Sequence, residues 1–394
     1  MQSYDESLNA LLENASAFRL KQRVGLDNAL GRVLGDEIYA KSDYPSEPMA
    51  AMDGYACLSQ DLENGAKLKI IDKIPAGKLP SAKISPKTCA KIFTGSLMPQ
   101  SANTLIPIEN VSANDEYIVV NEPVGAGFAV RGIGESYFRG ELLFKAGVRL
   151  KFSELAVLAE LGEHFVNVLA MPKVAILATG SELVDLGAHK NNMAQIYSSN
   201  TIALDSIVKS CGCQSLIMPL VNDDKKELEN AVHWALQTCD ILLSSGGVSV
   251  GDFDFMRDVV RQNAKIIVDK AAIKPGRHIK IAKMNEKFIF ALPGFSQSAM
   301  VTAMLYFRPF VAKIMGEDMK FWHKAILQND HKKRSELEEF VAANLEFDQA
   351  KITLNTQNKK KASSAVSTNL NHNAVLFRAK KDLKAGEIVE FCYL

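Results

Sequence analysis

Two carboxylates, Asp252 and Asp254, stand shortly after a serine- and glycine-rich stretch, Ser244-Ser245-Gly246-Gly247. The apolar run at 240–243 before this stretch has the length of a strand, and a helical pattern begins near residue 254. A strand, a glycine-rich loop and a helix in this order present backbone N–H groups to an anion. Carboxylates beside a bound phosphate are typical ligands of Mg²⁺. The stretch therefore predicts a phosphate-binding loop with a magnesium ion next to it.

A regular alternation of strand and helix patterns surrounds this loop. Strands are predicted at 174–178, 216–221, 241–243, 266–268, 279–282 and 288–292. Helix-face spacing predicts helices at 198–211, 225–238, 254–263 and 297–314. This alternation is typical of a doubly wound, mainly parallel sheet, in which the loops at the carboxyl ends of the strands form a crevice. We expect the crevice to be lined by the loops 179–183, 222–224, 244–254 and 293–297.

The flanking regions are richer in β patterns. Short strand patterns separated by glycine or proline fill residues 65–130 and predict a small β-rich lobe. Residues 320–394 also alternate as short strands and predict a barrel-like, all-β terminal domain. A short amphipathic helix is expected at 3–15, and a capped helical turn at 27–34. The predicted fold class is therefore an α/β multidomain protein.

The composition excludes some classes of function. The chain has 394 residues, and its 46 basic and 45 acidic residues give no overall field that attracts nucleic acid or a membrane surface. It has no apolar run long enough to span a membrane, and its acidic, polar N-terminus is unlike a secretory signal. The six cysteines are scattered, with only Cys211 and Cys213 close together, and the histidines have no metal-ligand spacing. We expect reduced thiols in a cytoplasmic protein.

Seven short motifs, taken together, carry a family resemblance. They are MDGYA at 52–56, FTGSLMP at 93–99, RGIGES at 131–136, ATGSEL at 178–183, SSGGVSVGDFDF at 244–255, IKPG at 273–276 and ALPG at 291–294. In this order they resemble the molybdopterin molybdenumtransferase family, the group of MoeA and the gephyrin E domain. The resemblance covers essentially the whole chain, and the combination of motifs is far more specific than a single glycine-rich loop.

The resemblance implies an architecture and a reaction. The implied domains are a discontinuous N-terminal α/β domain (1–43 and 131–170), the β-rich lobe (44–130), the molybdopterin-binding domain (171–316) and the C-terminal all-β domain (317–394). It also implies a homodimer whose site is shared between protomers. The implied reaction uses adenylylated molybdopterin and molybdate as substrates and Mg²⁺ as cofactor. It inserts molybdenum at the dithiolene sulfurs and releases AMP.

The resemblance also implies roles for individual residues. Glu182 and Asp254 are the expected Mg²⁺ ligands, with Asp252 as the alternative to Asp254. The expected catalytic residues are Asp53, Thr94, Asp224, Lys270 and Lys274, of which the lysines would neutralise charge on phosphate and molybdate. The residues expected to bind the pterin and its phosphates are Gly95, Thr179, Gly180, Ser198, Asn200, Ser245, Gly246, Gly247, Ser249, Gly251, Pro293 and Gly294.

Many of these residues also have a purely structural explanation. Asp53 precedes a glycine, as in an ordinary turn. Asp224 stands at the start of one predicted helix, and Ser198 or Ser199 at the start of another, where capping is a strong explanation. Glu182 is compatible with a carboxylate that stabilises a helix N-terminus. Either lysine could be a solvated surface charge, and the run Lys359-Lys360-Lys361 is interpreted as an exposed turn.

The chain departs from the family pattern in loops that the resemblance assigns to the substrate. The family usually reads LPGNPVS where this chain reads LPGFSQS, so that Phe295, Ser296 and Gln297 follow Gly294. Ser136 stands where the family has an acid. These changes give an alternative hypothesis, a catalytically weakened scaffold or carrier that binds the pterin. A third hypothesis is adenylylation of molybdopterin on the same α/β domain. The front half of the chain argues against it, because the adenylylating relatives lack that half.

Overall fold

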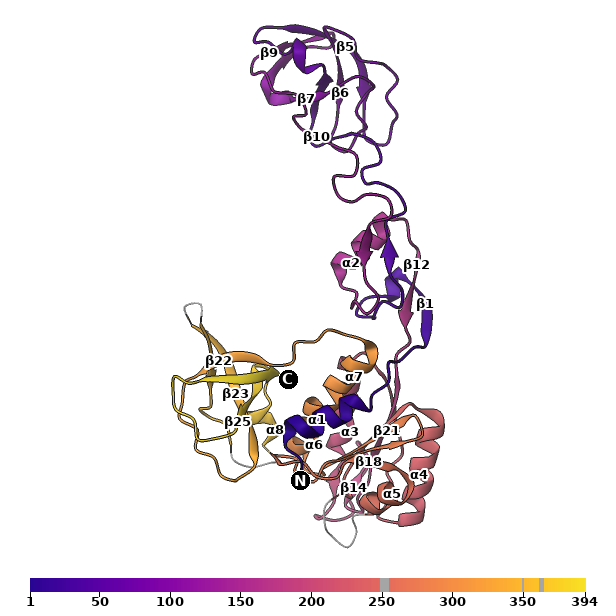
Figure 1. Cartoon of the computed structure of the whole chain (residues 1–394), viewed down its shortest axis with the longest axis vertical. Helices are drawn as coiled ribbons and strands as arrows, with labels where there is room; N and C mark the ends of the chain where they lie inside the picture. Colours follow the sequence, from indigo (N-terminus) through magenta and orange to yellow (C-terminus); the bar gives the residue numbers. More distant parts are fainter. Residues whose placement is uncertain (249–254, 349–350, 361–364) are drawn as a thin grey trace. The chain divides into compact units, whose positions relative to one another are not determined.

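The computed structural model describes residues 1–248, 255–348, 351–360 and 365–394 (Figure 1). The chain forms two compact units. The first unit comprises residues 1–35, 147–155 and 164–394, and the second comprises residues 36–146 and 156–163. Each unit is described by itself below. The predicted division into four domains is finer than these two units and stays a prediction.

A six-stranded sheet with the order β16-β13-β17-β21-β20-β18 forms the centre of the first unit. The strands from β16 to β21 are parallel to their neighbours, whereas β20 is antiparallel to both β21 and β18. The bounds are Gln214–Ile217 (β16), Lys173–Ala178 (β13), Ile241–Ser245 (β17), Lys287–Leu292 (β21), Lys280–Met284 (β20) and Lys265–Val268 (β18). The prediction of a mainly parallel sheet is confirmed.

Helices cover both faces of this sheet because its strands are apolar on both faces. In β13, Val174 and Ile176 pack into one core and Ala175 and Leu177 pack into the other. The second of these cores also receives α4 (Lys225–Thr238) and α5 (Phe255–Asn263). The first receives α1 (Tyr4–Glu13), α3 (Ser199–Ser210), α6 (Ser296–Thr302), a π-helical segment (Ala303–Phe307) and α7 (Arg308–Met315). The sheet is therefore doubly wound, as the sequence predicts.

The C-terminal strands close into a barrel. Among the described residues, β23 pairs with β24, β24 with β22, β22 with β26 and β26 with β25, and β25 pairs back with β23. Their bounds are His323–Leu327 (β22), Glu338–Asp348 (β23), Lys351–Asn355 (β24), Ala374–Ala379 (β25) and Ile388–Tyr393 (β26). The interior is filled by Leu327, Leu354, Phe377 and Phe391. The short strand β19 (Ile273–Lys274) joins β23 in parallel, which ties the α/β region to the barrel.

A second six-stranded sheet, with the order β7-β4-β6-β5-β9-β8, forms the β-rich lobe of the second unit. Its bounds are Thr104–Pro107 (β7), Gly54–Cys57 (β4), Thr88–Ile92 (β6), Lys67–Ile74 (β5), Tyr117–Val120 (β9) and Val111–Ala113 (β8). Two short antiparallel pairs accompany it, β3 (Met49–Ala50) with β10 (Val130–Arg131) and β2 (Ile38–Tyr39) with β11 (Leu142–Phe144). This lobe agrees with the β patterns of residues 65–130.

The remaining elements are short. In the first unit β1 (Lys21–Gly25) pairs with β12 (Phe165–Leu169), and β14 (Leu183–Val184) pairs with β15 (Ile196–Tyr197). Two further helices are α2 (Phe152–Glu160) and α8 (Val366–Asn369), and three 3₁₀ turns lie at Leu26–Asn28, Ser59–Asp61 and Ile108–Asn110. All six cysteines are buried free thiols, as expected for reduced structural cysteines.

Candidate functional site

Three parallel strands of the first unit end at the same edge of the sheet. The register pairs Ala178 with Ser245 and Ser245 with Leu292, so that β13, β17 and β21 finish side by side. The loops that follow remain in contact, because the Thr179 N–H donates to the Ser245 carbonyl (3.2 Å) and the Gly246 N–H donates to the Leu292 carbonyl (3.2 Å). The predicted crevice therefore exists in the described loops.

A small cavity of about 70 Å³ opens at this edge, here called the edge cavity. Seven of the residues predicted to bind substrate or metal line it: Thr179, Glu182, Ser198, Asn200, Ser245, Gly246 and Gly294. These residues come from four separate loops, so the sheet edge gathers positions more than 100 residues apart in sequence. Gly247 lies directly after Gly246, and Ser249 and Gly251 lie outside the described residues.

Gly246 allows two of these loops to approach one another. Its φ of +100° belongs to the left-handed region, which favours glycine. A Cβ atom at this position would lie only 2.5 Å from the carbonyl oxygen of Thr179. A larger residue would therefore force the loops after β13 and β17 apart and change the shape of the edge cavity.

Asn200 ties the edge cavity together and leaves one polar atom unused. Its Nδ2 donates to Ser245 Oγ and to the Gly294 carbonyl, each at 2.7 Å. Its Oδ1 is buried and has no hydrogen-bond partner among the described residues. A buried acceptor without a partner is costly in the free protein. It fits a site whose ligand brings an N–H or O–H donor.

Ser198 does not cap helix α3 as predicted. It occupies the N-cap position, but its side chain makes no capping hydrogen bond. Its hydroxyl instead shares a hydrogen bond of 2.6 Å with the Thr201 hydroxyl. The capping prediction is wrong for this side chain, whereas a contact between Ser198 and the pterin stays a prediction.

The two adjacent aspartates before α4 have different surroundings. Asp224 caps the helix, since its Oδ1 accepts the Glu227 N–H at 2.8 Å. Asp223 turns to the loop after β13, where its carboxylate accepts the Ser181 N–H (3.0 Å), the Ser181 hydroxyl (3.1 Å) and the Thr179 hydroxyl (3.3 Å). The structural explanation of Asp224 is thus observed, and its catalytic role stays a prediction. Asp223 was not selected from the sequence, where nothing but its neighbour distinguishes it.

Glu182 is the predicted metal ligand that the structure describes. Its carboxylate folds back over Gly180, within 2.8 Å of where a Cβ atom of that residue would stand. It also lines the edge cavity. The expected second ligand, Asp254, and its alternative, Asp252, lie outside the described residues. Within the described ranges, no group of three or more His, Cys, Asp or Glu side chains could hold a metal ion.

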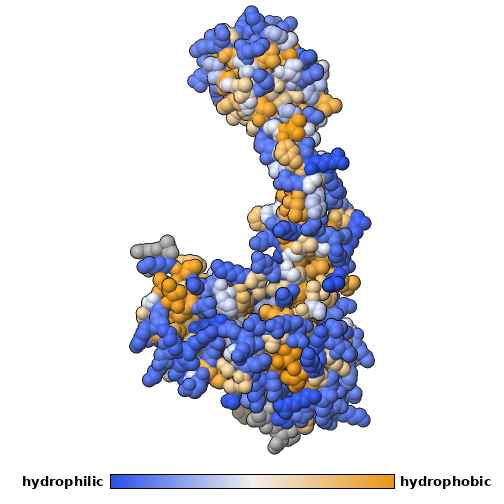
Figure 2. Space-filling view, viewed as in Figure 1, coloured by the Kyte–Doolittle hydropathy of each residue, from blue (hydrophilic) through white to orange (hydrophobic). Residues whose placement is uncertain are grey.

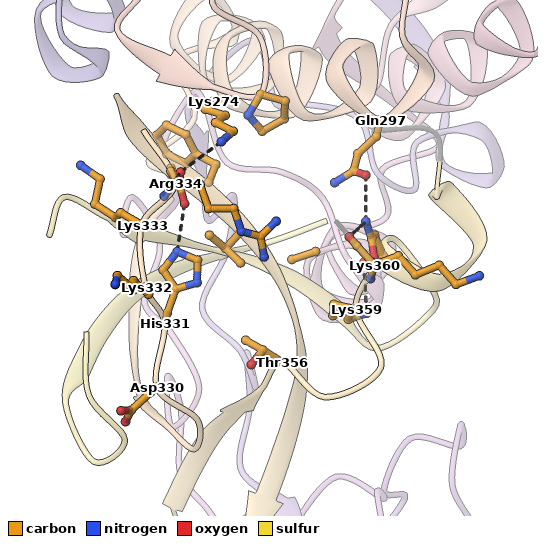
Figure 3. A pocket seen from close by; sticks show the side chains of 16 residues that line it. Lys274, Gln297, Asp330, His331, Lys332, Lys333, Arg334, Thr356, Lys359 and Lys360 are labelled. Carbon is orange, nitrogen blue, oxygen red and sulfur yellow. Dashed lines mark hydrogen bonds and ion pairs between the residues drawn. The ribbon is translucent and has the colours of Figure 1, made fainter. Parts of the chain in front are cut away.

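A second and larger cavity, of about 560 Å³, lies where the β19 segment meets the barrel (Figure 3). We call it the basic cavity, because six lysine and arginine residues but only two carboxylates line it. The cationic residues are Lys274, Lys332, Lys333, Arg334, Lys359 and Lys360, and the carboxylates are Asp330 and Glu339. Lys274 was predicted to act on substrate, whereas Lys270 lines neither cavity.

The buried carboxylate of Glu339 organises one wall of the basic cavity. Its Oε1 accepts hydrogen bonds from the Arg334 N–H (2.9 Å) and the Ser335 hydroxyl (3.1 Å), and the Lys274 ammonium lies 3.4 Å away. Its Oε2 contacts His331 Nε2 at 3.0 Å. Figure 3 shows Lys274 and His331 converging on this carboxylate. Burial by itself would raise the pKa of Glu339, but the hydrogen bonds and the lysine charge lower it overall.

The opposite wall corrects the interpretation of Lys359, whereas Lys360 is exposed as expected and Lys361 lies outside the described residues. Lys359 is not on an exposed turn, because its ammonium donates to the carbonyls of Thr368 (3.0 Å) and Asn369 (3.1 Å) and to Asn371 Oδ1 (3.0 Å). Burial lowers the pKa of Lys359. Asn369 in turn donates to Gln297 Oε1 at 2.9 Å. The sequence signals that could have indicated this cavity are the basic runs at 332–334 and 359–361.

Asp53 and Thr94 of the second unit form a hydrogen-bonded pair. Asp53 precedes β4 and Thr94 follows β6, and these strands are antiparallel neighbours. The Thr94 N–H and the Thr94 hydroxyl each donate to Asp53 Oδ1 at 2.8 Å, which lowers the pKa of Asp53. Gly54 must be glycine, because a Cβ there would lie 2.3 Å from the Ile106 carbonyl oxygen. Gly95 follows Thr94 with φ +79°, so the structure brings the exposed residues Asp53, Thr94 and Gly95 together from the loop before β4 and the turn after β6.

Comparison with known proteins assigns the chain to a family. Residues 2–162 match the MoeA N-terminal region (domain I and II), and residues 175–313 match the probable molybdopterin binding domain. A molybdopterin molybdenumtransferase of Haemophilus influenzae is 30% identical over 325 residues, which cover 82% of this chain and 80% of the relative. A second relative of the same name, from Nostoc sp., is 32% identical over 302 residues, which cover 74% of this chain and 69% of the relative. The chain belongs to the molybdopterin molybdenumtransferase family.

Membership of this family confirms the resemblance seen in the motifs. The crystal structure of the molybdopterin biosynthesis moeA protein from Pyrococcus horikoshii matches this chain with a TM-score of 0.84 and 26% identity, over 100% of both chains. The protein is therefore an α/β multidomain transferase of molybdenum cofactor biosynthesis. The roles of individual residues in this family member stay predictions.

In the described part of the chain, no helix combines the length and the apolar character needed to span a bilayer. Figure 2 shows that hydrophilic residues predominate on the face in view, with apolar residues in small separate groups.

Proposed function

We propose that this family member inserts molybdenum from molybdate into adenylylated molybdopterin, in a Mg²⁺-dependent reaction that releases AMP. The observation that carries the proposal is the presence of two different cavities in the first unit. The edge cavity is lined by glycines, hydroxyls and the amide of Asn200. The basic cavity is lined by lysines and an arginine. The first suits a pterin with a phosphate ester, and the second suits a tetrahedral oxyanion.

The edge cavity would hold the pterin and its phosphates. The unpartnered Oδ1 of Asn200 is placed to accept a hydrogen bond from the ligand. The glycines at 246 and 247 let a ligand phosphate approach the backbone closely, as glycines do in other phosphate-binding loops at the ends of parallel strands. Thr179 and Ser245 add hydroxyl groups beside them.

The basic cavity would hold molybdate before its transfer. Lys274 and Arg334 bring two positive charges, and the Gln297 side chain adds an amide. Fixed cations in a partly enclosed site stabilise an anion more than they do in open water. The loop after β21 borders both cavities, because Gly294 and Ser296 line the edge cavity and Gln297 lines the basic cavity. Gln297 of the proposed molybdate site is therefore only three residues away in sequence from Gly294 of the proposed pterin site.

Glu182 would hold the Mg²⁺ ion. Magnesium sites commonly use one or two carboxylates together with substrate phosphates and water. The single carboxylate that the described residues place at the edge cavity fits such an ion, with Asp254 proposed as the second ligand. When bound, the ion would supply positive charge that stabilises the phosphates during release of AMP.

Asp53 and Thr94 are proposed to serve the site of a partner protomer. This part of the proposal rests on the family resemblance and on the exposure of both side chains. It requires a homodimer, which a measurement of molecular mass in solution tests directly. A cytoplasmic location is proposed from the buried, unpaired cysteines.

The test is AMP release from adenylylated molybdopterin by the purified protein with molybdate and Mg²⁺. Glu182→Ala should raise the Mg²⁺ concentration needed for half-maximal release by about tenfold or more, because a charge-assisted contact contributes about 1.5–3 kcal/mol. Asp185→Ala is the matched control, since Asp185 is exposed, lies three residues further along the chain, just after β14, and does not line the edge cavity. AMP release that requires no Mg²⁺, or equal effects of the two substitutions, would contradict the metal assignment.

A scaffold or carrier is the second candidate function. The observation that favours it is Phe295, which stands next to Gly294 with 68% of its surface exposed, where the family usually has asparagine. A scaffold should retain the pterin through purification and release no AMP. Turnover with molybdate excludes this candidate.

A further inference from the structure

One oxygen atom in the basic cavity connects two segments that carry positive charge. Oε1 of Glu339 contacts the Lys274 ammonium at 3.4 Å and accepts the Arg334 N–H at 2.9 Å. Lys274 belongs to β19, and Arg334 lies in the loop before β23. The parallel pairing of Lys274 with Glu339 fixes the two backbones next to each other. Within this fixed backbone arrangement, the carboxylate of Glu339 links the Lys274 ammonium to the loop that carries Arg334.

The position of Glu339 is unexpected for a cavity that takes anions. A buried carboxylate repels an anion and competes with it for the lysine. The other carboxylate in the lining, Asp330, is directed elsewhere, since it accepts hydrogen bonds from the Lys384 ammonium (2.8 Å) and the Ala385 N–H (2.9 Å). Glu339 is only 4% exposed and contacts Lys274 directly. The presence of Glu339 in an anion-binding cavity would be explained if this carboxylate held Lys274 in position.

We propose that Glu339 is a positioning residue, which fixes the Lys274 ammonium relative to Arg334 and thereby sets the affinity of the basic cavity for molybdate. The inference rests on the proposed function, because it requires that the basic cavity binds this oxyanion. Glu339 itself does not contact the anion. It acts through Lys274, which has a half-exposed side chain and would otherwise sample many rotamers.

This role and a simple charge effect predict opposite signs for Glu339→Gln. Glutamine keeps the shape and an acceptor for the Arg334 N–H, but it loses the charge that holds Lys274. If Glu339 only repelled the anion, the variant would bind molybdate more tightly. If Glu339 positions Lys274, the variant binds molybdate more weakly, and we expect at least a fivefold increase in Kd.

The measurement is isothermal titration of sodium molybdate into the full-length protein. Glu336→Gln is the matched control, because it removes the same charge from the same segment, is exposed and does not line the cavity. Its Kd should stay within twofold of the parent value. In a Lys274→Ala background, Glu339→Gln should change Kd by less than twofold, since its effect passes through the lysine. Unchanged or tighter binding by Glu339→Gln overturns the inference.

Two further variants keep the result decisive. If Glu339→Gln does not fold, as judged by its melting curve, Glu339→Asp carries the test. It retains the charge but is one methylene shorter, so a charge effect leaves Kd unchanged and a positioning role weakens binding. Lys274→Ala alone tests the proposed function. If it leaves Kd unchanged, the basic cavity is not the molybdate site and the inference falls with it. If it weakens binding but neither Glu339 variant does, only the positioning role is wrong.

Discussion

Replacement of Gly246 by alanine should damage the edge cavity more than it damages the fold. Two costs can be worked out from the geometry. A residue with a Cβ atom at φ +100° costs about 1–2 kcal/mol in backbone energy. The Cβ would also lie 2.5 Å from the Thr179 carbonyl oxygen, and crowding of this kind costs about 1–3 kcal/mol. The sum is about 2–5 kcal/mol. The crowding is relieved only if the loop after β13 moves.

Gly316→Ala is the matched control for this experiment. Gly316 ends α7 in the same unit with φ +71°, and a Cβ there would meet nothing within 4 Å. It should therefore carry the backbone cost alone, about 1–2 kcal/mol. Since 1 kcal/mol corresponds to roughly 2–4 °C for a domain of this size class, Gly246→Ala should melt several degrees below Gly316→Ala.

The functional assay separates the two variants further. Binding of adenylylated molybdopterin, measured by titration, should weaken about tenfold or more in Gly246→Ala. The displaced loop needs to cost only about 1.4 kcal/mol of binding free energy to produce a tenfold increase in Kd. Gly316→Ala should bind like the parent protein. Equal melting temperatures together with equal binding would refute the reasoning, since they would mean that the Thr179 carbonyl does not constrain the loop.

Two other predictions concern the edge cavity and the barrel. Asn200→Ala removes two hydrogen bonds of 2.7 Å between cavity loops. At about 1 kcal/mol for each bond, pterin binding should weaken by up to about 30-fold in the same titration. Arg378→Met should lower the melting temperature, because the Arg378 guanidinium donates hydrogen bonds to the carboxylates of both Glu338 (2.7 Å) and Asp5 (2.8 Å). Burial would raise the pKa of Asp5, but the hydrogen bonds and charges of Arg378 and Lys380 lower it overall. The contribution of Asp5 to stability is therefore fully present above its unfolded pKa near 3.8 and is lost as the pH falls through its lower folded pKa. Melting curves from pH 2 to 6 should show this acid-sensitive part reduced in Arg378→Met.

Local patterns in the sequence predicted the elements that bury a regular apolar face. Helix-face spacing in 225–238 places Leu228, Val232, Ala235 and Leu236 on one side, and these are the buried residues of α4. The pattern of α3 is less regular, and its apolar residue Ile202 is 45% exposed. The capped helical turn at 27–34 is only a 3₁₀ turn at Leu26–Asn28. The strand predicted at 216–221 corresponds to β16, which spans Gln214–Ile217. The bounds were misjudged because β16 is an edge strand with largely exposed side chains, so that its apolar residues do not show where the strand begins or ends.

Residues that follow parallel strands were predictable as a site, whereas contacts between domains were not. The Thr179, Ser245 and Gly294 positions come from strand ends, and parallel strands bring their carboxyl ends together in any doubly wound sheet. No comparable rule predicts from the sequence that Glu339 contacts a site residue. Its contact with Lys274 spans 65 residues and depends on how β19 joins the barrel. No periodicity within either segment encodes that pairing.

The altered loop after β21 favours an enzyme over a scaffold. The contact by which this loop helps to form the edge cavity uses the backbone, since Asn200 donates to the carbonyl of Gly294. A change of the following side chains from the family pattern leaves that bond available. Phe295 points its side chain largely into solvent, and Gln297 is held by Asn369 on the side of the basic cavity. The changed side chains therefore alter the border between the two cavities, while the backbone contact of Gly294 with Asn200 at the proposed pterin site is retained.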